Sequence, residues 1–281
     1  MSTTNPPKKD HWTAQAYNST AAFVPKLTTT VTSYLDPQPS DRILDIGCGD
    51  GELTSQISTR LDASQGGSIL GVDSSISFIQ TAKERYPHIP FLLHDATLLD
   101  TCKDLSPSSS SREGGPWDKI FSNAAMHWIL RPPQTRRKFF ESCHSLLRPS
   151  GTLVFEQGGH GNVSEILTAS IAALTHHGVP LETAREASPW FFPSKDWMRR
   201  MLEETGFEVV ELETEYRPSR VEDVEGWVRL MCAEFLEFAP EGTKESVVRE
   251  ICELVDAAIT REEDGSTWLG YLRLRGVARK K

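Results

Sequence analysis

Apolar and polar positions switch between two periods along the first half of the chain, and this switching predicts alternating strands and helices. Short apolar runs bounded by turn residues, such as RILDIG at 42–47, are typical of buried parallel strands. Segments such as GELTSQISTRL at 51–61 instead carry apolar residues at helical spacing. The same two patterns predict strands at 68–73, 89–96, 117–123 and 151–157 and helices at 74–86 and 133–147. The expected fold class is therefore α/β, with a mostly parallel sheet covered by helices on both faces.

The second half of the chain is less regular. Its pattern predicts helices at 163–178, 194–206, 221–239 and 244–262, and strands at 207–217 and 267–280. We expect the last two strands to extend the sheet in antiparallel order, which brings it to seven strands. The remaining helices are then expected to cover one end of the sheet.

The N-terminal region divides into two parts. Residues 1–10 are polar and show no period, so we expect a disordered tail. Residues 11–36 carry apolar positions at helical spacing, with a break between two helices at Pro25. From residue 11 to residue 281 we expect a single domain.

Composition narrows the classes of partner. The 281 residues carry a formal net charge of −9, which argues against electrostatic binding of nucleic acid or of an anionic membrane over a broad surface. The five cysteines are scattered and form no C-x-x-C pair, so we expect free thiols and no zinc site or other metal. No apolar run has the length of a signal peptide core or a membrane span, and a cytoplasmic location is the expectation.

Three glycines crowd the turn after the first strand. The stretch LDIGCGDGEL places Gly47, Gly49 and Gly51 between Asp45 and a helix. Without a Cβ the backbone can approach a ligand closely, and a helix N-terminus offers unpaired N–H groups. The spacing D-x-G-x-G-x-G is neither the dinucleotide pattern G-x-G-x-x-G nor a phosphate-binding loop, since no lysine follows. A tight turn that only packs the helix on the strand is the alternative.

This stretch resembles the first motif of the class I S-adenosylmethionine-dependent methyltransferases, a family with a Rossmann-like, doubly wound sheet. The resemblance covers roughly residues 40–280 in fold order and is most specific over 42–128. It implies that the chain is an enzyme, that S-adenosyl-L-methionine is its cofactor, and that residues 42–157 form the cofactor-binding core.

The resemblance also assigns cofactor contacts in chain order. In the glycine turn it points to Asp45, near the aminoacyl end of the cofactor, and to Gly47, Cys48 and Gly49. After the next strands it points to Asp73 and Ser74 for the ribose, to Asp95 and Ala96 for the adenine, and to Asn123 and Ala124 for the methionine end. Asp73 has an alternative role, because an aspartate at a strand end can simply cap the next helix.

One group within the family is nearer than the rest. SNAAMHWI at 122–129, together with an N-terminal Trp and Tyr, is similar to the trans-aconitate methyltransferase group of small-molecule O-methyltransferases. In that group an N-terminal helix closes over the cofactor, so the resemblance makes Tyr17 a cofactor contact and Trp12 a substrate contact. Core packing of both aromatics is the alternative. The resemblance also implies a lid of N-terminal helices at 11–36 and substrate-covering helices at 160–205 and 218–264.

The acceptor itself stays open at this point, because EQGGHGNVSEI at 156–166 departs from the aconitate enzymes. An aromatic acceptor pocket is expected from Trp128 and from the segment PWFFPS through its Trp190, Phe191 and Phe192, unless these rings only pack a small lid. A tricarboxylate acceptor would need arginine partners, for which the candidates are Arg131, Arg185, Arg199, Arg200, Arg217 and Arg220.

His127 is the candidate catalytic residue. Methyl transfer needs an oxygen held in line with the sulfonium, and a carboxylate oxygen is already ionised near pH 7. A phenol or alcohol would need a general base, and His127 is the one histidine that matches a family motif. The alternative is that His127 shapes the pocket or forms a hydrogen bond to the substrate without taking its proton.

The expected function is therefore methyl transfer to the oxygen, carboxylate or hydroxyl, of a small-molecule acceptor. Two alternatives remain: a methyltransferase that acts on a protein, and a partner subunit that binds the cofactor without turnover. The acidic charge counts against nucleic acid as the acceptor, and the glycine spacing counts against a nicotinamide oxidoreductase.

Overall fold

The computed structural model describes residues 28–105 and 117–281. Within these residues the main sheet has seven strands in the order β3-β2-β1-β4-β5-β9-β6. The strands are β1 (Arg42–Ile46), β2 (Ser68–Asp73), β3 (Phe91–Leu93), β4 (Trp117–Asn123), β5 (Leu147–Gly158), β6 (Phe207–Tyr216) and β9 (Leu272–Lys280). The strands β1 to β5 pair in parallel, and β9 pairs antiparallel with both β5 and β6, as predicted.

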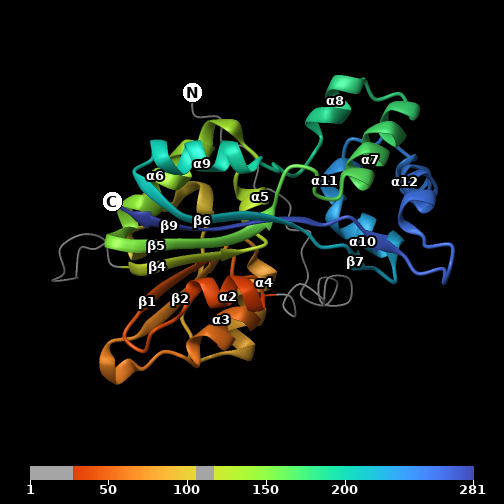
Figure 1. Ribbon diagram of the computed structural model, residues 1–281. Helices are drawn as coiled ribbons and strands as arrows, with labels where there is room; N and C mark the ends of the chain where they lie inside the picture. Colours follow the sequence, from red (N-terminus) through yellow and green to blue (C-terminus); the bar gives the residue numbers. More distant parts are fainter. Residues whose placement is uncertain (1–27, 106–116) are drawn as a thin grey trace, which may run out of the picture.

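Helices cover both faces of this sheet (Figure 1). On one face lie α2 (Thr29–Leu35), α3 (Glu52–Ser58) and α4 (Ile76–Arg85), and on the other lie α5 (Met126–Ile129), α6 (Arg136–Leu146) and α9 (Lys195–Glu204). Helix α4 shows why these segments are helical. Ser75 caps its first turn by accepting from the N–H of Phe78, and Phe78, Ile79 and Ala82 form its buried stripe. The predicted doubly wound α/β fold is confirmed.

A helical cap with its own hydrophobic core stands beside one end of the sheet (Figure 1). It consists of α7 (Ser164–His176), α8 (Leu181–Glu186), α10 (Val224–Met231), α11 (Ala233–Leu236), α12 (Lys244–Ile259) and a two-stranded sheet of β7 (Ser219–Arg220) and β8 (Trp268–Leu269). Short 3-10 turns lie elsewhere, at η2 (Ala63–Gln65), η3 (Ala96–Thr101), η4 (Lys103–Leu105) and η5 (Pro133–Thr135).

The segment 160–205, predicted as one covering insertion, belongs to two layers. Helices α7 and α8 lie in the cap, but Met198 and Leu202 of α9 pack on the sheet in the core shared with β6. Their spacing of four residues gives α9 one apolar stripe, which it buries against the sheet.

Two predicted elements are divided in the structure. The helix expected at 221–239 breaks at Cys232 into α10 and α11. The strand expected at 267–280 breaks at Gly270 and Tyr271, where the chain leaves the small sheet of the cap and enters the main sheet. The alternating pattern of residues 267–280 is the same in both parts, so it does not show that the chain passes from one sheet to another. Among the described helices, none is long and apolar enough to cross a membrane.

Candidate functional site

The three glycines in the turn after β1 differ in what surrounds them. A Cβ on Gly47 would lie 2.1 Å from the Cβ of Ala125, and one on Gly51 would lie 2.7 Å from the ring of Phe91. A Cβ on Gly49 would meet no atom within 4 Å. All three residues have positive φ, at 78°, 56° and 80°. Gly47 and Gly51 therefore satisfy the packing of the protein itself, while Gly49 borders open space that suits a ligand.

Asp73 connects this turn to the end of β2. One carboxylate oxygen accepts from the N–H of Gly49 at 3.0 Å, and the other accepts from the N–H of Ser75 at 2.9 Å. The helix α4 is capped by Ser75, so capping is not the role of Asp73. Each carboxylate oxygen can accept more than one hydrogen bond, and a carboxylate is a group that can accept from ribose hydroxyls. The open space at Gly49 and this carboxylate fit an adenosine-bearing cofactor.

Asp45 lies beneath the turn. It is 2% exposed and accepts a hydrogen bond from the Thr54 hydroxyl at 2.6 Å, which ties β1 to α3. Burial raises the pKa of Asp45 to about 7, and the nearby charge of Asp73 adds to the rise. The side chain thus supports the turn from below. Its predicted contact with the aminoacyl end of the cofactor stays a prediction.

The other predicted cofactor residues lie along the same edge of the sheet. The Cys48 side chain is buried in the core under the turn, and burial raises the pKa of its thiol. Ser74 is exposed beside Asp73. Asp95 is exposed after β3 and caps the turn η3, which begins at Ala96, by accepting from the N–H of Thr97 at 2.8 Å.

The segment after β4 closes this edge. Asn123 ends β4, and Ala124 has a left-handed backbone with φ of 55°. The N–H of Ala124 donates to the carbonyl of Glu156 at 2.7 Å, which holds the segment against β5. Ala125 then packs on Gly47. The structure therefore brings the glycine turn and the predicted methionine-end residues together, although almost eighty positions separate them in the chain.

His127 follows on α5 and is buried, at 8% exposure. Its Nδ1 accepts from the N–H of Gly158 at 3.4 Å, so the neutral ring carries its proton on Nε2. Burial lowers the pKa of His127 to about 3, and the positive charge of Arg273 lowers it further. A histidine with so low a pKa is a poor general base near pH 7 but a good neutral hydrogen-bond donor.

His127 lines a cavity of about 50 Å³ between α5 and the cap. On the sheet side the cavity is lined by Ala124 and Trp128. On the other side it is lined by Trp190 and Phe192 of the loop 188–194, which precedes α9. Of the predicted pocket aromatics, Trp128, Trp190 and Phe192 thus lie at the cavity. Phe191 does not, because it packs on Trp197 at 4.9 Å and under the guanidinium of Arg136.

The arginine at this cavity was not among those predicted from the sequence. Arg273 of β9 is 4% exposed and lines the cavity, together with Tyr271 and Asn162. The candidate arginines Arg131, Arg185, Arg199, Arg200, Arg217 and Arg220 are absent from the cavity wall. Most of them pair with carboxylates elsewhere, as Arg131 does with Glu234 and Arg217 with Glu156. The alternating run LRLRG was the available signal, since an arginine inside a buried strand is uncommon.

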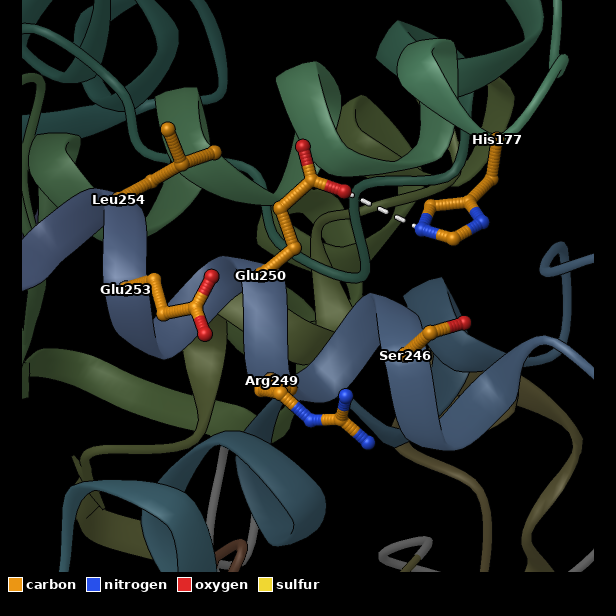
Figure 2. Close-up of a pocket in the computed structure, with 6 residues that line it drawn as sticks. All are labelled: His177, Ser246, Arg249, Glu250, Glu253 and Leu254. Atoms are coloured by element: carbon orange, nitrogen blue, oxygen red, sulfur yellow. Dashed lines mark ion pairs between the residues drawn. The ribbon is translucent and has the colours of Figure 1, made fainter.

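A second, larger hollow of about 430 Å³ lies on the outer face of the cap, along α12. Half of its lining residues are exposed, and its charged members are Arg249, Glu250 and Glu253. Figure 2 shows Glu250 turned toward His177, with which it pairs at 3.1 Å. His176 pairs with the same carboxylate. This hollow is remote from the glycine turn in the fold, so we assign the chemistry to the smaller, buried cavity.

Two predicted contacts, Trp12 and Tyr17, lie outside the described residues. Within residues 28–105 and 117–281, no three His, Cys, Asp or Glu side chains are grouped so as to hold a metal ion.

Residues 44–153 match the family model described as a methyltransferase domain. An uncharacterized methyltransferase of Schizosaccharomyces pombe, C70.08c, is 35% identical over 274 residues, which cover 97% of this chain and 99% of that protein. A trans-aconitate 2-methyltransferase of Variovorax paradoxus is 25% identical over 85% of this chain and 87% of its own length. A putative methyltransferase structure from Bacillus halodurans superposes with a TM-score of 0.58 at 15% identity, over 91% of this chain and 99% of that one.

Proposed function

The chain belongs to the class I S-adenosylmethionine-dependent methyltransferases, and from this premise we propose that it methylates an oxygen of a small-molecule acceptor. The observation that carries the proposal is the cavity at His127. It adjoins the edge of the sheet at which β1, β2, β3 and β4 end, which we call the cofactor edge. Ala124 belongs to both, because it lines the cavity and lies next to the residue that packs on Gly47. A recess walled mainly by buried side chains suits a small acceptor better than a folded protein surface.

The cofactor edge would hold S-adenosylmethionine through three features. Gly49 offers a backbone surface without a side chain, Asp73 offers acceptor oxygens for the ribose, and Asp95 lies at the expected adenine end. Asn123 and Ala124 are the residues proposed for the methionine end. When bound, S-adenosylmethionine supplies an electrophilic methyl group on its sulfonium.

The state of His127 favours an acceptor that needs no base. A neutral imidazole with its proton on Nε2 donates a hydrogen bond and orients an oxygen, but it does not take a proton readily at a pKa of about 3. A carboxylate is ionised at neutral pH and attacks without losing a proton. We therefore propose a carboxylate oxygen ahead of a hydroxyl. The trans-aconitate 2-methyltransferase relative is named for an acceptor that also carries carboxylates.

The test is incubation of the full chain with methyl-labelled S-adenosylmethionine and two panels, small carboxylic acids and small phenols or alcohols. Label in a base-labile ester of an acid is the expected result. Label only in protein, or no transfer to any member of either panel while the cofactor still binds, would contradict the proposal. The second outcome would leave the alternative of a partner subunit that binds the cofactor without turnover.

A further inference from the structure

Resting on the proposed function, we propose that Arg136 is a positioning residue for methyl transfer. Its guanidinium joins helix α5 to the loop 188–194 and so fixes the distance between two walls of the acceptor cavity. Arg136 is the first residue of α6 and is not among the residues that line the cavity. It acts through the side chains of α5 on one wall and through those of the loop on the other.

The end of helix α5 is the first group that Arg136 holds. Its Nε–H donates to the carbonyl of Leu130 at 2.7 Å, and its Nη2–H donates to the carbonyl of Arg131 at 3.0 Å. Both carbonyls follow the last residue of α5, so they have no partner inside the helix. Helix α5 carries His127 and Trp128, and its four residues form little more than one turn. The planar fork of the guanidinium therefore fixes the direction of this short helix.

The ring of Phe191 is the second group that Arg136 holds. The guanidinium carbon lies 3.4 Å from the centre of this ring, well within the range of a cation–π contact. The same ring meets Trp197 of α9 edge-on at 4.9 Å. The backbone N–H of Phe191 donates to the carbonyl of His127 at 2.9 Å, which ties the loop directly to α5. Arg136 thus holds both partners of this hydrogen bond, Phe191 by its ring and His127 by the end of its helix.

The residues on either side of Phe191 connect it to the cavity. Trp190 and Phe192 pack with the core of the cap and line the cavity, whereas Phe191 packs with the core under α6 and α9. Across the cavity, the ring of Phe192 lies 5.6 Å from that of His127. The ring of Trp190 lies 5.6 Å from that of Trp128. A shift of Phe191 would therefore change the separation of the walls at two places.

Arg136 differs from the next residue of α6 in its partners. Arg137 is exposed and pairs with the carboxylates of Glu141 and Glu204, each at 2.9 Å. Arg136 is half-buried, and its partners among the described residues are two carbonyls and a ring. Carbonyls accept hydrogen bonds along preferred directions, and surface ion pairs hold their side chains only loosely. The contacts of Arg136 therefore define a geometry, which those of Arg137 do not.

This geometry matters for the acceptor more than for the cofactor. In-line transfer depends on placement, and a displacement of about 1 Å can lower the rate by about 100-fold. Gly49 and Asp73 bond to each other at the cofactor edge. Neither takes part in the contacts that Arg136 makes within the described part of the chain. Loss of Arg136 should therefore impair the acceptor side and spare cofactor binding.

Hydrogen exchange of the full chain, followed by mass spectrometry, tests the anchor without any acceptor. In Arg136→Gln, the amides of 126–131 and 188–194 should exchange about tenfold or more faster than in the wild type, because local opening becomes easier. Exchange at 47–51 should not change. Arg137→Gln is the matched control and should leave both segments as in the wild type. Unchanged exchange in the two segments, or equal acceleration over the whole protein, would overturn the inference.

A lysine variant covers the case in which Arg136→Gln does not fold. Arg136→Lys keeps the charge but loses the fork and the planar face that stacks on Phe191. It should fold and still show faster exchange in the same two segments. Exchange equal to that of the wild type would show that a charge near the end of α5 is sufficient, which would contradict the proposed geometry.

Kinetics separate positioning from a loss of stability. With an acid that takes label in the panel assay, Arg136→Gln should lower kcat/KM for that acid by about 10- to 100-fold. Its affinity for S-adenosylhomocysteine, measured by calorimetry, should stay within about twofold of the wild-type value. Equal losses on the acceptor and cofactor sides would refute the assignment.

The two proposals fail separately. Faster exchange confined to the two segments, with no transfer to any small molecule by the wild type, would support the anchor and refute the proposed function. Methyl transfer by the wild type, with unchanged exchange and unchanged kcat/KM in a folded Arg136 variant, would refute the anchor while the proposed function stands.

Discussion

The cofactor edge of the sheet and the aromatic cavity meet at residues 123–128, but they are built in different ways. At the edge, the backbone forms the binding surface, and Gly49, Asp73 and the turn after β4 all lie within a few residues of a strand end. At the cavity, side chains form the surface, and they come from α5, the loop 188–194, α10 and β9. In our proposal the edge holds the cofactor, whereas the cavity selects the acceptor.

A second difference concerns charge. Acidic side chains dominate the edge, where burial raises the pKa of Asp45 to about 7. At the cavity the one charged side chain that the described residues bring to the wall is Arg273, and burial, together with the charge of Arg273, lowers the pKa of His127 to about 3. A cationic sulfonium cofactor and an anionic acceptor would each meet the opposite sign of charge. The following predictions test this contrast, from the largest expected effect to the smallest.

Asp73→Ala should weaken S-adenosylhomocysteine binding by about 3 to 6 kcal/mol, since two charged hydrogen bonds to the ribose are lost together with the support of Gly49. Calorimetry measures this directly. Asp62→Ala is the matched control, because Asp62 likewise accepts from the N–H two residues on, that of Ser64, but lies at the turn η2 before β2, away from the edge. Wild-type affinity in a folded Asp73→Ala protein would remove this residue from the cofactor site.

Asp45→Asn should change how stability depends on pH. The folded protein holds the Asp45 proton up to about pH 7, while the unfolded chain releases it near pH 4. The folded state thus binds more protons in this window, so Asp45 lowers the free energy of unfolding as pH rises. Asparagine keeps the acceptor for Thr54 and carries no charge. The variant should equal the wild type at pH 4 and exceed it by about 4 kcal/mol at pH 8 in urea unfolding. Parallel curves for the two proteins would refute the raised pKa.

Gly49→Ala should reduce cofactor affinity by about 10- to 100-fold, because its Cβ would enter the space that borders the turn. Gly66→Ala is the control. It also has positive φ, at 86°, and open surroundings, but it ends the turn η2. Both variants should lose about 1 kcal/mol of stability from the left-handed backbone. Only Gly49→Ala should lose cofactor binding, and equal affinities in the two variants would show that the open space is not the cofactor site.

His127 gives the smallest expected effect. With a pKa of about 3, it should contribute no inflection to kcat between pH 6 and pH 9. His127→Gln keeps a donor, so it should raise KM by about tenfold or less and change kcat little. A rate that rises through a pKa near 6.5, with a loss in kcat of about 100-fold or more in the variant, would instead make His127 the general base.

Much of the cofactor edge was readable from the sequence. The sheet, the strand ends and the glycine turn follow from short-range patterns, and parallel strands place their C-terminal ends at one edge. The predicted antiparallel extension is also present. Less was readable in the second half, where α9 joins the sheet layer and the last strand divides at Gly270. In those regions the position and the ends of an element depend on the residues that it packs against, and the local sequence pattern does not contain this information.

The sequence by itself determined the fold class, the cofactor and the backbone turn that meets it, because glycine and aspartate at strand ends have a local geometric reason. Only the tertiary structure decided that Phe192 and not Phe191 reaches the cavity, that six candidate arginines stay away from it, and that Arg273 lies in its wall. It also decided that His127 is buried and neutral. These outcomes depend on which distant side chains surround a group, since burial and neighbouring charge set both its pKa and its partners.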